Sequence, residues 1–381
     1  MKIGFLTLEY PHPKTGVSGG IGTSILNLAK GLVALGHEVN VVVLGQAKDA
    51  VFHDNGITFY SIQNIKFKGL SLLLTQKKVE RLINKLVSAN RIDLIEAHDW
   101  SGITAFINPK CPVIIRLNGT DTYFCHLENR PVKWKNKFLE NRGLQKADGI
   151  ISVSNFTAEL TKKLFHLKTP ITVIPNAIDT NQFEAAIEPN NSETILYFGT
   201  LIRKKGLLEL PFIFNEVVKK RPTAKLLLVG KDASDIATNS KSTWQLMQPL
   251  FENEAIKNVT YLGVVSYAEI KSTIQQATLC VFPTFAEALP VSWLEAMAMQ
   301  KPIVASNIGW ATDIVDNGSD GYLVHPNNHN QFADRILELL QDKNLQLQIG
   351  NKARQKIIEK FSIESVAAQS VAFYNQFLNK E

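Results

Sequence analysis

A strand end, a loop and the start of a helix follow one another in Pro283-Thr-Phe-Ala-Glu287-Ala-Leu-Pro290-Val-Ser-Trp-Leu-Glu295-Ala-Met-Ala298. Pro290 fits the first position of the helix, so we expect Glu287 in the loop and Glu295 more than one turn inside the helix. In α/β proteins, this junction at the carboxyl ends of the strands is where ligands bind. The pattern therefore predicts an α/β fold in which two carboxylates flank the edge of one ligand-binding cleft.

The start of the same helix is suited to an anion. Backbone N–H groups in its first turn have no partner within the helix and carry partial positive charge, so a diphosphate is a suitable ligand. This favours a nucleotide-sugar pocket between Glu287 and Glu295. An acid before a helix is also a favourable partner of the helix dipole, and Glu295 would fit a solvent-facing position equally well. The spacing of the two glutamates alone leaves both interpretations open.

The two glutamates also carry a family resemblance. Glu287-x7-Glu295, continued by Ala-Met-Ala298 and by Lys301-Pro-Ile-Val-Ala-Ser306, resembles the signature block of the retaining family 4 glycosyltransferases, or glycosyl transferases group 1. The similarity extends over most of the chain. It implies the GT-B architecture, in which two Rossmann-like, doubly wound parallel-sheet domains face a central cleft. The donor would be bound mainly by the second domain and the acceptor by the first.

The resemblance also implies a reaction. The protein is expected to move a sugar, with retention of anomeric configuration, from a UDP- or GDP-linked sugar to a hydroxyl of a glycan or lipid-linked acceptor, in cell-surface polysaccharide or glycoconjugate synthesis. Glu287 would hold the sugar hydroxyls, Glu295 the ribose hydroxyls, and Lys205 the charge that develops on the diphosphate. The nucleotide sugar is a substrate, so no cofactor is expected. Because the chain has no Asp-x-Asp motif, a metal-clamped donor is not indicated.

Length and composition fit two soluble domains. A chain of 381 residues is longer than one ordinary core and predicts two domains of roughly 150 to 200 residues. No apolar run reaches the roughly 20 residues of a membrane-spanning helix, and residues 1–10 resemble a buried strand rather than a secretory signal. Cys111, Cys125 and Cys280 are odd in number and widely spaced, which supports neither a disulfide framework nor a zinc site. We therefore expect a cytoplasmic protein.

Periodic apolar patterns divide the chain into two βαβ domains with largely parallel sheets. The first is predicted at residues 1–180 and the second at 190–361, with a linker near 176–193 and a helix at 362–381 that, as in the family, returns to the first domain. Strands are predicted at 2–8, 37–44, 57–62, 92–97, 112–117, 149–153, 171–174, 194–199, 224–229, 258–262, 278–282, 302–305 and 321–324. Helices are predicted at 23–35, 76–89, 133–146, 154–165, 206–220, 240–253, 266–275, 290–299, 329–341 and 344–359.

A basic turn between glycines follows the first strand of the second domain, in Gly199-Thr200-Leu-Ile-Arg203-Lys204-Lys205-Gly206. Glycines permit close backbone approach, and cations beside them can meet phosphate. The turn resembles the family's Gly-Arg…Lys-Gly diphosphate clamp. Lys205 matches its lysine, whereas Thr200 stands where arginine is common, so Arg203 or Lys204 would have to supply the second cation. A solvated basic turn is the alternative.

A glycine-rich loop, Gly16-Val-Ser-Gly19-Gly20-Ile-Gly22-Thr23, follows the first strand of the chain and opens a helix. Its N–H groups are placed to approach phosphate or sugar. The loop does not spell G-x-G-x-x-G, and the next strand ends in Val43-Leu44-Gly45 without the acid that would hold a ribose. A nicotinamide-dependent dehydrogenase is therefore disfavoured. In the family this loop lies across the cleft from the donor diphosphate, which implies a phosphate or acceptor role for Gly19, Gly20 and Gly22.

Two other strand ends of the first domain carry polar side chains. Asn118 occupies the position of a family histidine that approaches the donor sugar, and we place it in the catalytic set with Glu287 and Lys205. Its amide can orient a sugar hydroxyl but cannot titrate near neutrality, and structuring the loop explains it equally well. His98 and Asp99 end an earlier strand, where either could contact acceptor hydroxyls. Capping or packing accounts for these two equally well.

Further donor contacts follow from the resemblance. The strand ends at Gly230-Lys231 and at Val264 correspond to positions that hold the nucleobase in relatives, largely through backbone groups. In the signature loop, Ala288-Leu289-Pro290 replaces the common Gly-Phe-Gly, and the proline removes one N–H donor. Leu289 and Val291 remain as donor contacts in an altered sugar pocket.

The first half of the chain holds the excess of positive charge. Residues 1–185 contain 22 Lys and Arg against 15 Asp and Glu, whereas residues 186–381 contain 19 against 20. Two basic stretches stand out, Lys77, Lys78, Arg81 and Lys85 in one, and Lys133, Lys135, Lys137, Arg142 and Lys146 in the other. They could attach the protein to the anionic cytoplasmic face of a membrane, although solvated helix faces explain each equally well. No nucleic-acid-binding motif accompanies the charge, so a nucleic-acid partner is not expected.

Two other functions are compatible with the same residues. A nucleotide-sugar epimerase or hydrolase of the same two-domain shape would form product without an acceptor. A non-catalytic sensor would bind the nucleotide sugar without turnover, and the departures at Thr200, Asn118 and Pro290 make this conceivable.

Overall fold

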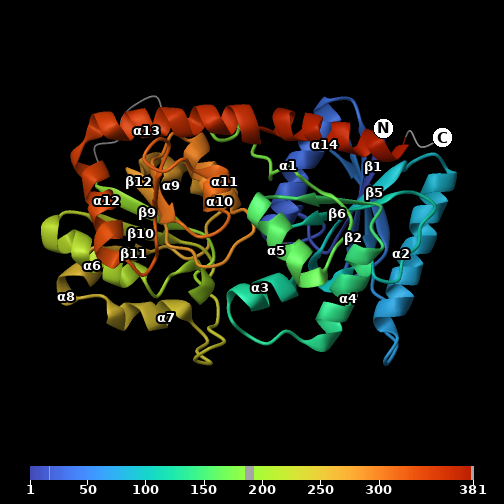
Figure 1. The fold of residues 1–381 in the computed structure, drawn as a ribbon, viewed down its shortest axis with the longest axis horizontal. Coiled ribbons are helices and arrows are strands. Elements are labelled where there is room, and N and C mark those ends of the chain that lie inside the picture. The colour runs from blue at the N-terminus through green and yellow to red at the C-terminus, as the bar shows by residue number, and fades with distance from the viewer. Residues whose placement is uncertain (17, 185–192, 379–381) are drawn as a thin grey trace. The chain divides into compact units, whose positions relative to one another are not determined.

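The computed structural model describes residues 1–16, 18–184 and 193–378, which divide into two compact units (Figure 1). The first unit comprises Met1–Ile178 and Phe361–Glu381, and the second comprises Asp179–Lys360. The chain therefore leaves the first unit and returns to it near its end. Residues 185–192 of the predicted linker and second domain, and residues 379–381 of the predicted final helix, lie outside the described residues.

The strands of the first unit pair in the order β3-β4-β2-β1-β5-β6-β7-β8. Their bounds are β1 (Lys2–Thr7), β2 (Glu38–Leu44), β3 (Ala50–Asp54), β4 (Ile57–Ile62), β5 (Leu94–His98), β6 (Val113–Leu117), β7 (Gly149–Ser152) and β8 (Ile171–Val173). The predicted parallel pairing of β1, β2 and β4 to β8 is confirmed. Strand β3 has no counterpart among the predicted strands and forms an antiparallel hairpin with β4. Asn55 and Gly56 make its turn, with the positive φ angles of 48° and 76° that a two-residue hairpin loop requires.

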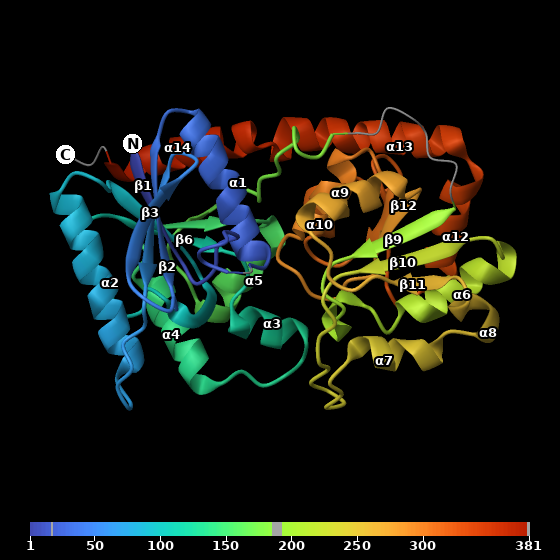
Figure 2. The same ribbon diagram turned by 180° about the vertical axis from the view of Figure 1, so that it is seen from behind.

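Helices cover both faces of this sheet. They are α1 (Gly20–Ala34), α2 (Ser71–Ser88), α3 (Asp121–Leu127), α4 (Trp134–Gln145), α5 (Asn155–Phe165) and α14 (Ile363–Leu378), with a 3₁₀ turn at Trp100–Gly102. Helices α1 and α2 lie on opposite faces (Figures 1 and 2). Alternation along β1 explains this arrangement, because Phe5 packs into the cluster under α1 and Leu6 into the cluster under α2. Helix α1 begins three residues earlier than predicted, and α3 is an additional helix, capped by the Thr120 hydroxyl.

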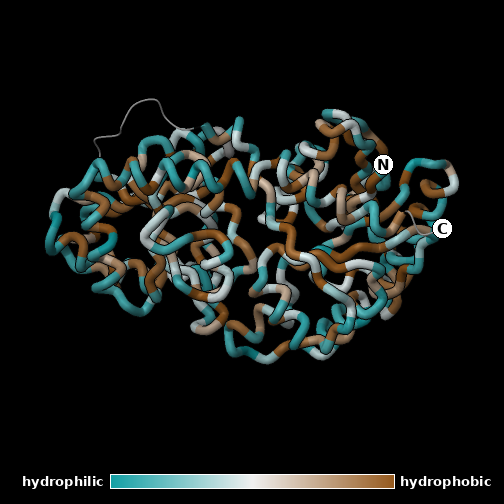
Figure 3. Tube along the Cα trace, turned by 45° about the horizontal axis from the view of Figure 1, so that its top comes forward, coloured by the Kyte–Doolittle hydropathy of each residue, from teal (hydrophilic) through white to brown (hydrophobic). Residues whose placement is uncertain are grey.

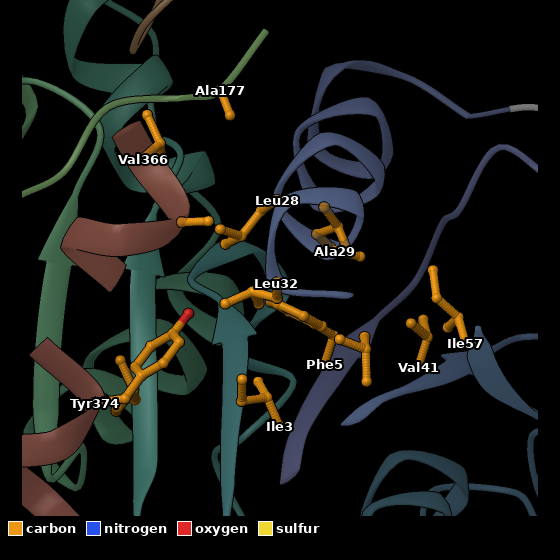
Figure 4. Close-up of a cluster of buried hydrophobic side chains, with 14 of the residues drawn as sticks. Ile3, Phe5, Leu28, Ala29, Leu32, Val41, Ile57, Ala177, Val366 and Tyr374 are labelled. Carbon is orange, nitrogen blue, oxygen red and sulfur yellow. The ribbon is translucent and has the colours of Figure 1, made fainter. Parts of the chain in front are cut away.

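The final helix is part of the first unit's core. Ile3, Phe5, Leu28 and Leu32 are buried in one cluster with Tyr374 of α14 (Figure 4). Brown, apolar stretches run through the interior of each unit, whereas teal, polar stretches lie mainly on its surface (Figure 3). Each large apolar side chain of such a cluster contributes about 1.5–3 kcal/mol to folding when it is fully buried. The unit therefore needs α14 to complete its apolar core.

Close approach and a buried ion pair hold α14 in place. A Cβ at Gly31 of α1 would lie 2.6 Å from the Ile363 carbonyl oxygen, so glycine permits the two helices to touch. The Arg116 guanidinium donates to Glu96 at 2.8 Å, and both side chains are nearly fully buried. The Tyr374 hydroxyl donates to the same carboxylate at 2.5 Å. Because buried charges are tolerated only when they are paired and hydrogen-bonded, this network ties α14 to β5 and β6.

The strands of the second unit pair in parallel, in the order β11-β10-β9-β12-β13-β14. They are β9 (Thr194–Phe198), β10 (Lys225–Val229), β11 (Val259–Tyr261), β12 (Leu279–Phe282), β13 (Ile303–Ser306) and β14 (Tyr322–Val324). The helices are α6 (Leu210–Lys220), α7 (Thr243–Met247), α8 (Asn253–Ile256), α9 (Tyr267–Gln276), α10 (Val291–Ala298), α11 (Ala311–Ile314), α12 (His329–Gln341) and α13 (Lys343–Lys356). Short helical turns occupy Arg203–Lys205 and Gln248–Leu250, and a further turn at Ile357–Phe361 leads into the first unit. The predicted second doubly wound sheet is confirmed.

One predicted helix of the second unit is wrong. Residues 240–253 were expected to form a continuous helix, but the segment is divided into α7, a 3₁₀ turn and the start of α8. Pro249 lies in the middle and has no N–H for the helical ladder, which explains the break. Helix α6 also begins at Leu210 rather than at Gly206.

None of the helices in the described part of the chain combines the length and apolar character needed to cross a membrane.

Candidate active site

The candidate site of the second unit is built at the carboxyl ends of β9 and β12. The 3₁₀ turn Arg203–Lys205 follows β9, and the loop with Glu287 connects β12 to α10. The Lys205 ammonium nitrogen lies 3.1 Å from Oε1 of Glu287, and the two side chains are 21% and 17% exposed. A ligand can therefore reach the pair, although water is partly excluded. The structure thus brings together two of the three residues predicted as catalytic, while Asn118 belongs to the first unit.

Backbone contacts fix the two segments that carry this pair. The N–H groups of Phe285 and Ala286 both donate to the Lys204 carbonyl oxygen, at 2.8 and 3.2 Å. Gly206 ends the basic turn with φ of 73°, and a Cβ at this position would clash with the Pro283 carbonyl group. A side chain here would be strained and would push the turn away from the loop. Glycine is therefore required for the Lys205–Glu287 contact.

The pair keeps Glu287 ionised. Burial alone would raise the pKa of this carboxyl group, but the positive charges of Lys205 and Lys204 and the hydrogen bonds from the Lys205 ammonium and the Ala288 N–H outweigh it. The pKa of Glu287 is consequently lower than that of an ordinary glutamate. A carboxylate in this state accepts hydrogen bonds and does not donate them.

Glu295 lies inside α10 and is only 7% exposed. The alternative that it occupies a solvent-facing helix position is therefore wrong. Pro290 is the N-cap in an extended conformation, and Val291, rather than Pro290, is the first helical residue. Leu289 is buried and Val291 is half-buried beside it. The helix start and the two glutamates are arranged as predicted, with one carboxylate before the helix and one within it.

Two glycines let neighbouring strand ends approach each other. Gly199 and Gly230 both have φ of 139°, and a Cβ at Gly230 would clash with the Gly199 carbonyl group. The Tyr197 hydroxyl donates to the Thr200 carbonyl oxygen at 2.9 Å. Burial and then the Glu287 carboxylate raise the pKa of Tyr197 well above its ordinary value, so its proton is available for this bond. Tyr197 is not among the predicted site residues, and its only signal in the sequence is its place two residues before the first glycine of the clamp.

Arg203, one of the two candidates for the second cation of the predicted clamp, is engaged elsewhere. The Arg203 guanidinium donates to both carboxylate oxygens of Asp235, at 2.7 and 2.8 Å. The hydrogen bonds from Arg203 lower the pKa of Asp235 to about 2. Arg203 would have to leave this bidentate partner to meet a phosphate, so it is a poor substitute for the arginine that Thr200 replaces. At the ends of β10 and β11, the side chains of Lys231 and Val264 are exposed.

In the first unit, a side chain already occupies the glycine-rich loop. Gly19 is the N-cap of α1, and Gly20 and Gly22 lie in its first turn. The Gly22 N–H donates to Oε1 of Glu9 at 3.0 Å, and a Cβ at Gly19 would lie 3.3 Å from the same oxygen. An internal carboxylate therefore already takes up one N–H group of this helix start. The loop is accordingly less suited to phosphate than the sequence pattern implies.

Asp99 structures the loop after β6. Its two carboxylate oxygens accept the N–H groups of Asn118 and Gly119, at 3.0 and 3.1 Å. Burial raises the pKa of Asp99 to about 7, although these N–H groups oppose the shift. Of the two explanations left open, the geometry supports packing for Asp99 rather than contact with an acceptor. Asp99 fixes the backbone from which the Asn118 side chain projects.

His98 is buried beside Asn118. Both side chains line a cavity of about 10 Å³, together with Ser24 and Arg116, which is room for about one water molecule. No described residue hydrogen-bonds to either ring nitrogen of His98. Burial lowers the pKa of His98 to about 4, so the imidazole is neutral at physiological pH. Neither His98 nor Asn118 therefore carries charge in this part of the first unit.

Within the described residues, no group of three or more His, Cys, Asp or Glu side chains is placed to hold a metal ion. The chemically distinctive feature of the second unit is instead one ammonium group, one ionised carboxylate and a helix start at the end of two parallel strands. Such a set suits a ligand that combines hydroxyls with negative charge.

Two family profiles cover most of the chain. Residues 18–182 match the profile described as Glycosyltransferase Family 4, and residues 179–356 match the profile described as Glycosyl transferases group 1. The chain is 25% identical over 396 residues to N-acetyl-alpha-D-glucosaminyl L-malate synthase of Bacillus anthracis, with 97% of this chain and 96% of that protein covered. Both profiles and a full-length relative thus point to one family.

Solved structures share the fold. Sucrose-phosphate synthase of Thermosynechococcus elongatus superposes with a TM-score of 0.79 at 20% identity, and all of both chains is covered. HepE of Anabaena, solved in complex with UDP, superposes with a TM-score of 0.74 at 19% identity, with 99% of this chain and 100% of that chain covered. The protein therefore has the GT-B fold and belongs to the family 4 glycosyltransferases.

Proposed function

We propose that the protein is a retaining, metal-independent hexosyltransferase. It moves a sugar from a UDP- or GDP-linked donor to a hydroxyl of a glycan or lipid-linked acceptor, in the synthesis of a cell-surface polysaccharide or glycoconjugate in the cytoplasm. The observation that carries the proposal is the 3.1 Å contact between Lys205 and Glu287 at the start of α10. The neighbour HepE was solved with UDP bound, which supports a uridine nucleotide.

The second unit is proposed to hold the donor. The Lys205 ammonium group would neutralise charge that develops on the diphosphate as the bond from sugar carbon to phosphate oxygen breaks. Glu287, which is ionised, accepts hydrogen bonds from sugar hydroxyls, and Glu295 accepts those of the ribose. Each charged hydrogen bond is worth about 1.5–3 kcal/mol. The absence of an Asp-x-Asp motif supports a donor held by these side chains rather than through a metal.

The leaving group is proposed to take the acceptor's proton. A new bond forms between the sugar carbon and the acceptor oxygen, and the proton of that hydroxyl passes to the departing phosphate oxygen. This assignment is supported by the lowered pKa of Glu287, which makes its carboxylate a weak proton acceptor. Departure and attack on the same face of the sugar would retain the anomeric configuration.

A binding screen followed by a transfer assay tests the proposal. Uridine and guanosine diphosphates and their sugars are added to the protein, because a ligand that binds only the folded state raises the thermal unfolding midpoint. The stabilising donor is then incubated with and without acceptors, and the anomeric configuration of the product is determined by NMR. Product formed only with an acceptor supports transfer. Product formed without one favours the epimerase or hydrolase, and binding without any product favours the sensor.

Tyr197 offers a smaller test of the same site. Changing Tyr197 to Phe removes the hydrogen bond to the Thr200 carbonyl group, so we expect the donor KM to rise roughly 3- to 10-fold, which corresponds to about 1 kcal/mol. The acceptor KM should stay unchanged. Tyr322→Phe is the matched control, because the Tyr322 hydroxyl donates to Glu338 within the same unit. Equal donor KM values for Tyr197→Phe and the wild type would show that Tyr197 does not position the clamp.

We further propose that the first unit attaches to an anionic membrane surface through the start of α4. Trp134 is 77% exposed and Phe138 is 43% exposed. The two rings stack with centroids 5.5 Å apart. Lys133, Lys135 and Lys137 are exposed around them. Exposed aromatic rings among lysines are typical of segments that lie in the headgroup region of anionic bilayers.

Vesicle flotation checks this attachment. Phosphatidylglycerol vesicles should carry the wild type upward and phosphatidylcholine vesicles should not, whereas Trp134→Ala should reduce flotation several-fold. Ile236→Ala serves as the control, because Ile236 is equally exposed, at 76%, in the second unit. Equal flotation with the two kinds of vesicle would contradict the proposed surface. Equal flotation of Trp134→Ala and the wild type would also contradict it.

A further inference from the structure

A second hollow of the first unit lies at the other end of the strands of its sheet, away from His98 and Asn118. Its free volume is about 370 Å³, and it is formed by the turn at 104–113 and by the segment 143–148. The turn leads into β6, and the second segment joins the end of α4 to β7. The hollow therefore lies at the amino ends of these strands, whereas His98 and Asn118 lie at the carboxyl ends. A volume of this size falls within the roughly 300–1,000 Å³ range of small-molecule sites.

Part of the lining of this hollow is apolar. Ile107 and Val113 are buried there, and Cys111 is half-buried. Burial, and then the nearby Asp148 and Asp93 carboxylates, raise the pKa of Cys111 to about 12, so the thiol remains neutral and belongs to the apolar surface. Ile107, Cys111 and Val113, called the floor below, therefore offer a compact apolar surface to a ligand.

The rim is charged. Lys110 and Lys146 are exposed at the edge of the hollow, with Asn108 and Asp148 beside them. One oxygen of Asp148 accepts the Val113 N–H at 2.8 Å, so part of its negative charge is taken up by the backbone. Asp93 and Glu80 lie nearby but do not line the hollow. Among the charged side chains that do line it, two ammonium groups outnumber this one carboxylate, and an anionic group is therefore the favoured polar end of a ligand.

Side-chain hydrogen bonds to the backbone fix the wall. The Asn108 N–H donates to Glu80 at 2.9 Å, and the Lys110 N–H donates to the Asn84 side chain at 2.8 Å. The Arg142 guanidinium donates to the Ala105 carbonyl oxygen at 2.9 Å. These bonds come from α2 and α4, so two helices hold the turn in shape before any ligand arrives. A preformed wall lowers the ordering cost of binding.

We propose that this hollow is a second binding site of the protein. It takes a small molecule with a compact apolar or aromatic body and one phosphate or carboxylate group. The body lies on the floor of Ile107, Cys111 and Val113, and the anionic group meets Lys110 and Lys146. This site is separate from the donor clamp of the second unit and does not depend on the function proposed above.

Calorimetric titration with phenyl phosphate tests the site, with phenol as the neutral counterpart. Phenyl phosphate should bind the wild type and bind the double variant Lys110→Ala/Lys146→Ala at least about tenfold more weakly, since it loses charged hydrogen bonds. Lys162→Ala/Lys163→Ala is the matched control, because both lysines are exposed on α5 of the same unit, and it should bind as the wild type does. Lys205→Met should also leave this binding unchanged.

Hydrogen exchange locates the ligand. Phenyl phosphate should slow amide exchange in residues 104–113 and 143–148, and leave residues 199–206 unaffected. The proposal is overturned if phenyl phosphate does not bind, if phenol binds equally well, or if the Lys110/Lys146 variant retains full affinity. Protection confined to residues 199–206 would also overturn it, because the anion would then occupy the clamp of the second unit.

Discussion

Replacing Glu287 with glutamine is expected to reduce glycosyl transfer by roughly 10- to 100-fold, the equivalent of about 1.5–3 kcal/mol of transition-state stabilisation. Glutamine preserves the size of the side chain but carries no charge, so it accepts weaker hydrogen bonds from the sugar hydroxyls. It also leaves the Lys205 ammonium, 3.1 Å away in the wild type, without its anionic partner. Initial rates measured across donor and acceptor concentrations will give kcat and both KM values.

The matched control is Glu216→Gln, which removes a carboxylate that pairs with Lys219 on the surface of α6. Exposed pairs of this kind contribute little, so its transfer rate and thermal midpoint should stay close to those of the wild type. Circular dichroism and the unfolding midpoint show whether Glu287→Gln remains folded. A folded Glu287→Gln variant with normal turnover would remove this carboxylate from the mechanism.

Replacing Lys205 with methionine should have the largest effect, roughly 100- to 1,000-fold on kcat, which is typical when one group that stabilises transition-state charge is lost. Methionine keeps the length and most of the volume of lysine. The loss should appear in kcat more than in the donor KM, because charge on the diphosphate grows as the glycosidic bond breaks. Lys219→Met is the control, since Lys219 forms exposed ion pairs on α6. An equal loss in both variants would show that the effect is not specific to the clamp.

Lys205→Met should also alter how the stability of the protein depends on pH. In the wild type, the pKa of Glu287 lies below its ordinary value despite burial, owing to Lys205 and Lys204. The pair therefore stabilises the fold at pH values above the ordinary pKa of glutamate, and this contribution is lost as the pH falls through the lowered pKa of Glu287. Without Lys205, burial dominates and the pKa of Glu287 should rise. We expect the variant to be less stable than the wild type by about 1–3 kcal/mol at pH 7, with a smaller difference near pH 4, as measured by denaturant unfolding.

The architecture was largely predictable because its signals are local. Parallel strands buried on both faces appear as short apolar runs. In the helices between them, apolar residues recur every three or four positions, so most elements could be placed within a few residues. The misses have local causes too. β3 is short and half-exposed, but its Asn55-Gly56 turn is a hairpin signal that was available in the sequence. The broken helix at 240–253 contains Pro249, which was an equally available signal for its interruption.

The site was only partly predictable because contacts between distant residues leave no spacing pattern. Lys205 and Glu287 could be assigned to one site from the family's motifs, but the Arg203–Asp235 pair could not, because 32 positions separate its members. Glu9 likewise reaches Gly22 through the fold, 13 residues away. Tyr197 gave no signal apart from its position before a glycine. Motifs thus identified Lys205 and Glu287, the groups proposed to meet the ligand, whereas the groups that hold them in place required the structure.

The position of α14 determines when the first unit can mature. Its buried Tyr374 completes the Glu96–Arg116 network, and the helix packs along Gly31 of α1. During translation, residues 1–178 leave the ribosome early, yet they lack this helix until the whole second unit has been synthesised. The second unit, which is continuous in sequence, can fold as soon as it emerges. The nascent N-terminal sheet must therefore wait with part of one apolar face uncovered, and exposed apolar surface of this kind makes folding intermediates prone to aggregation.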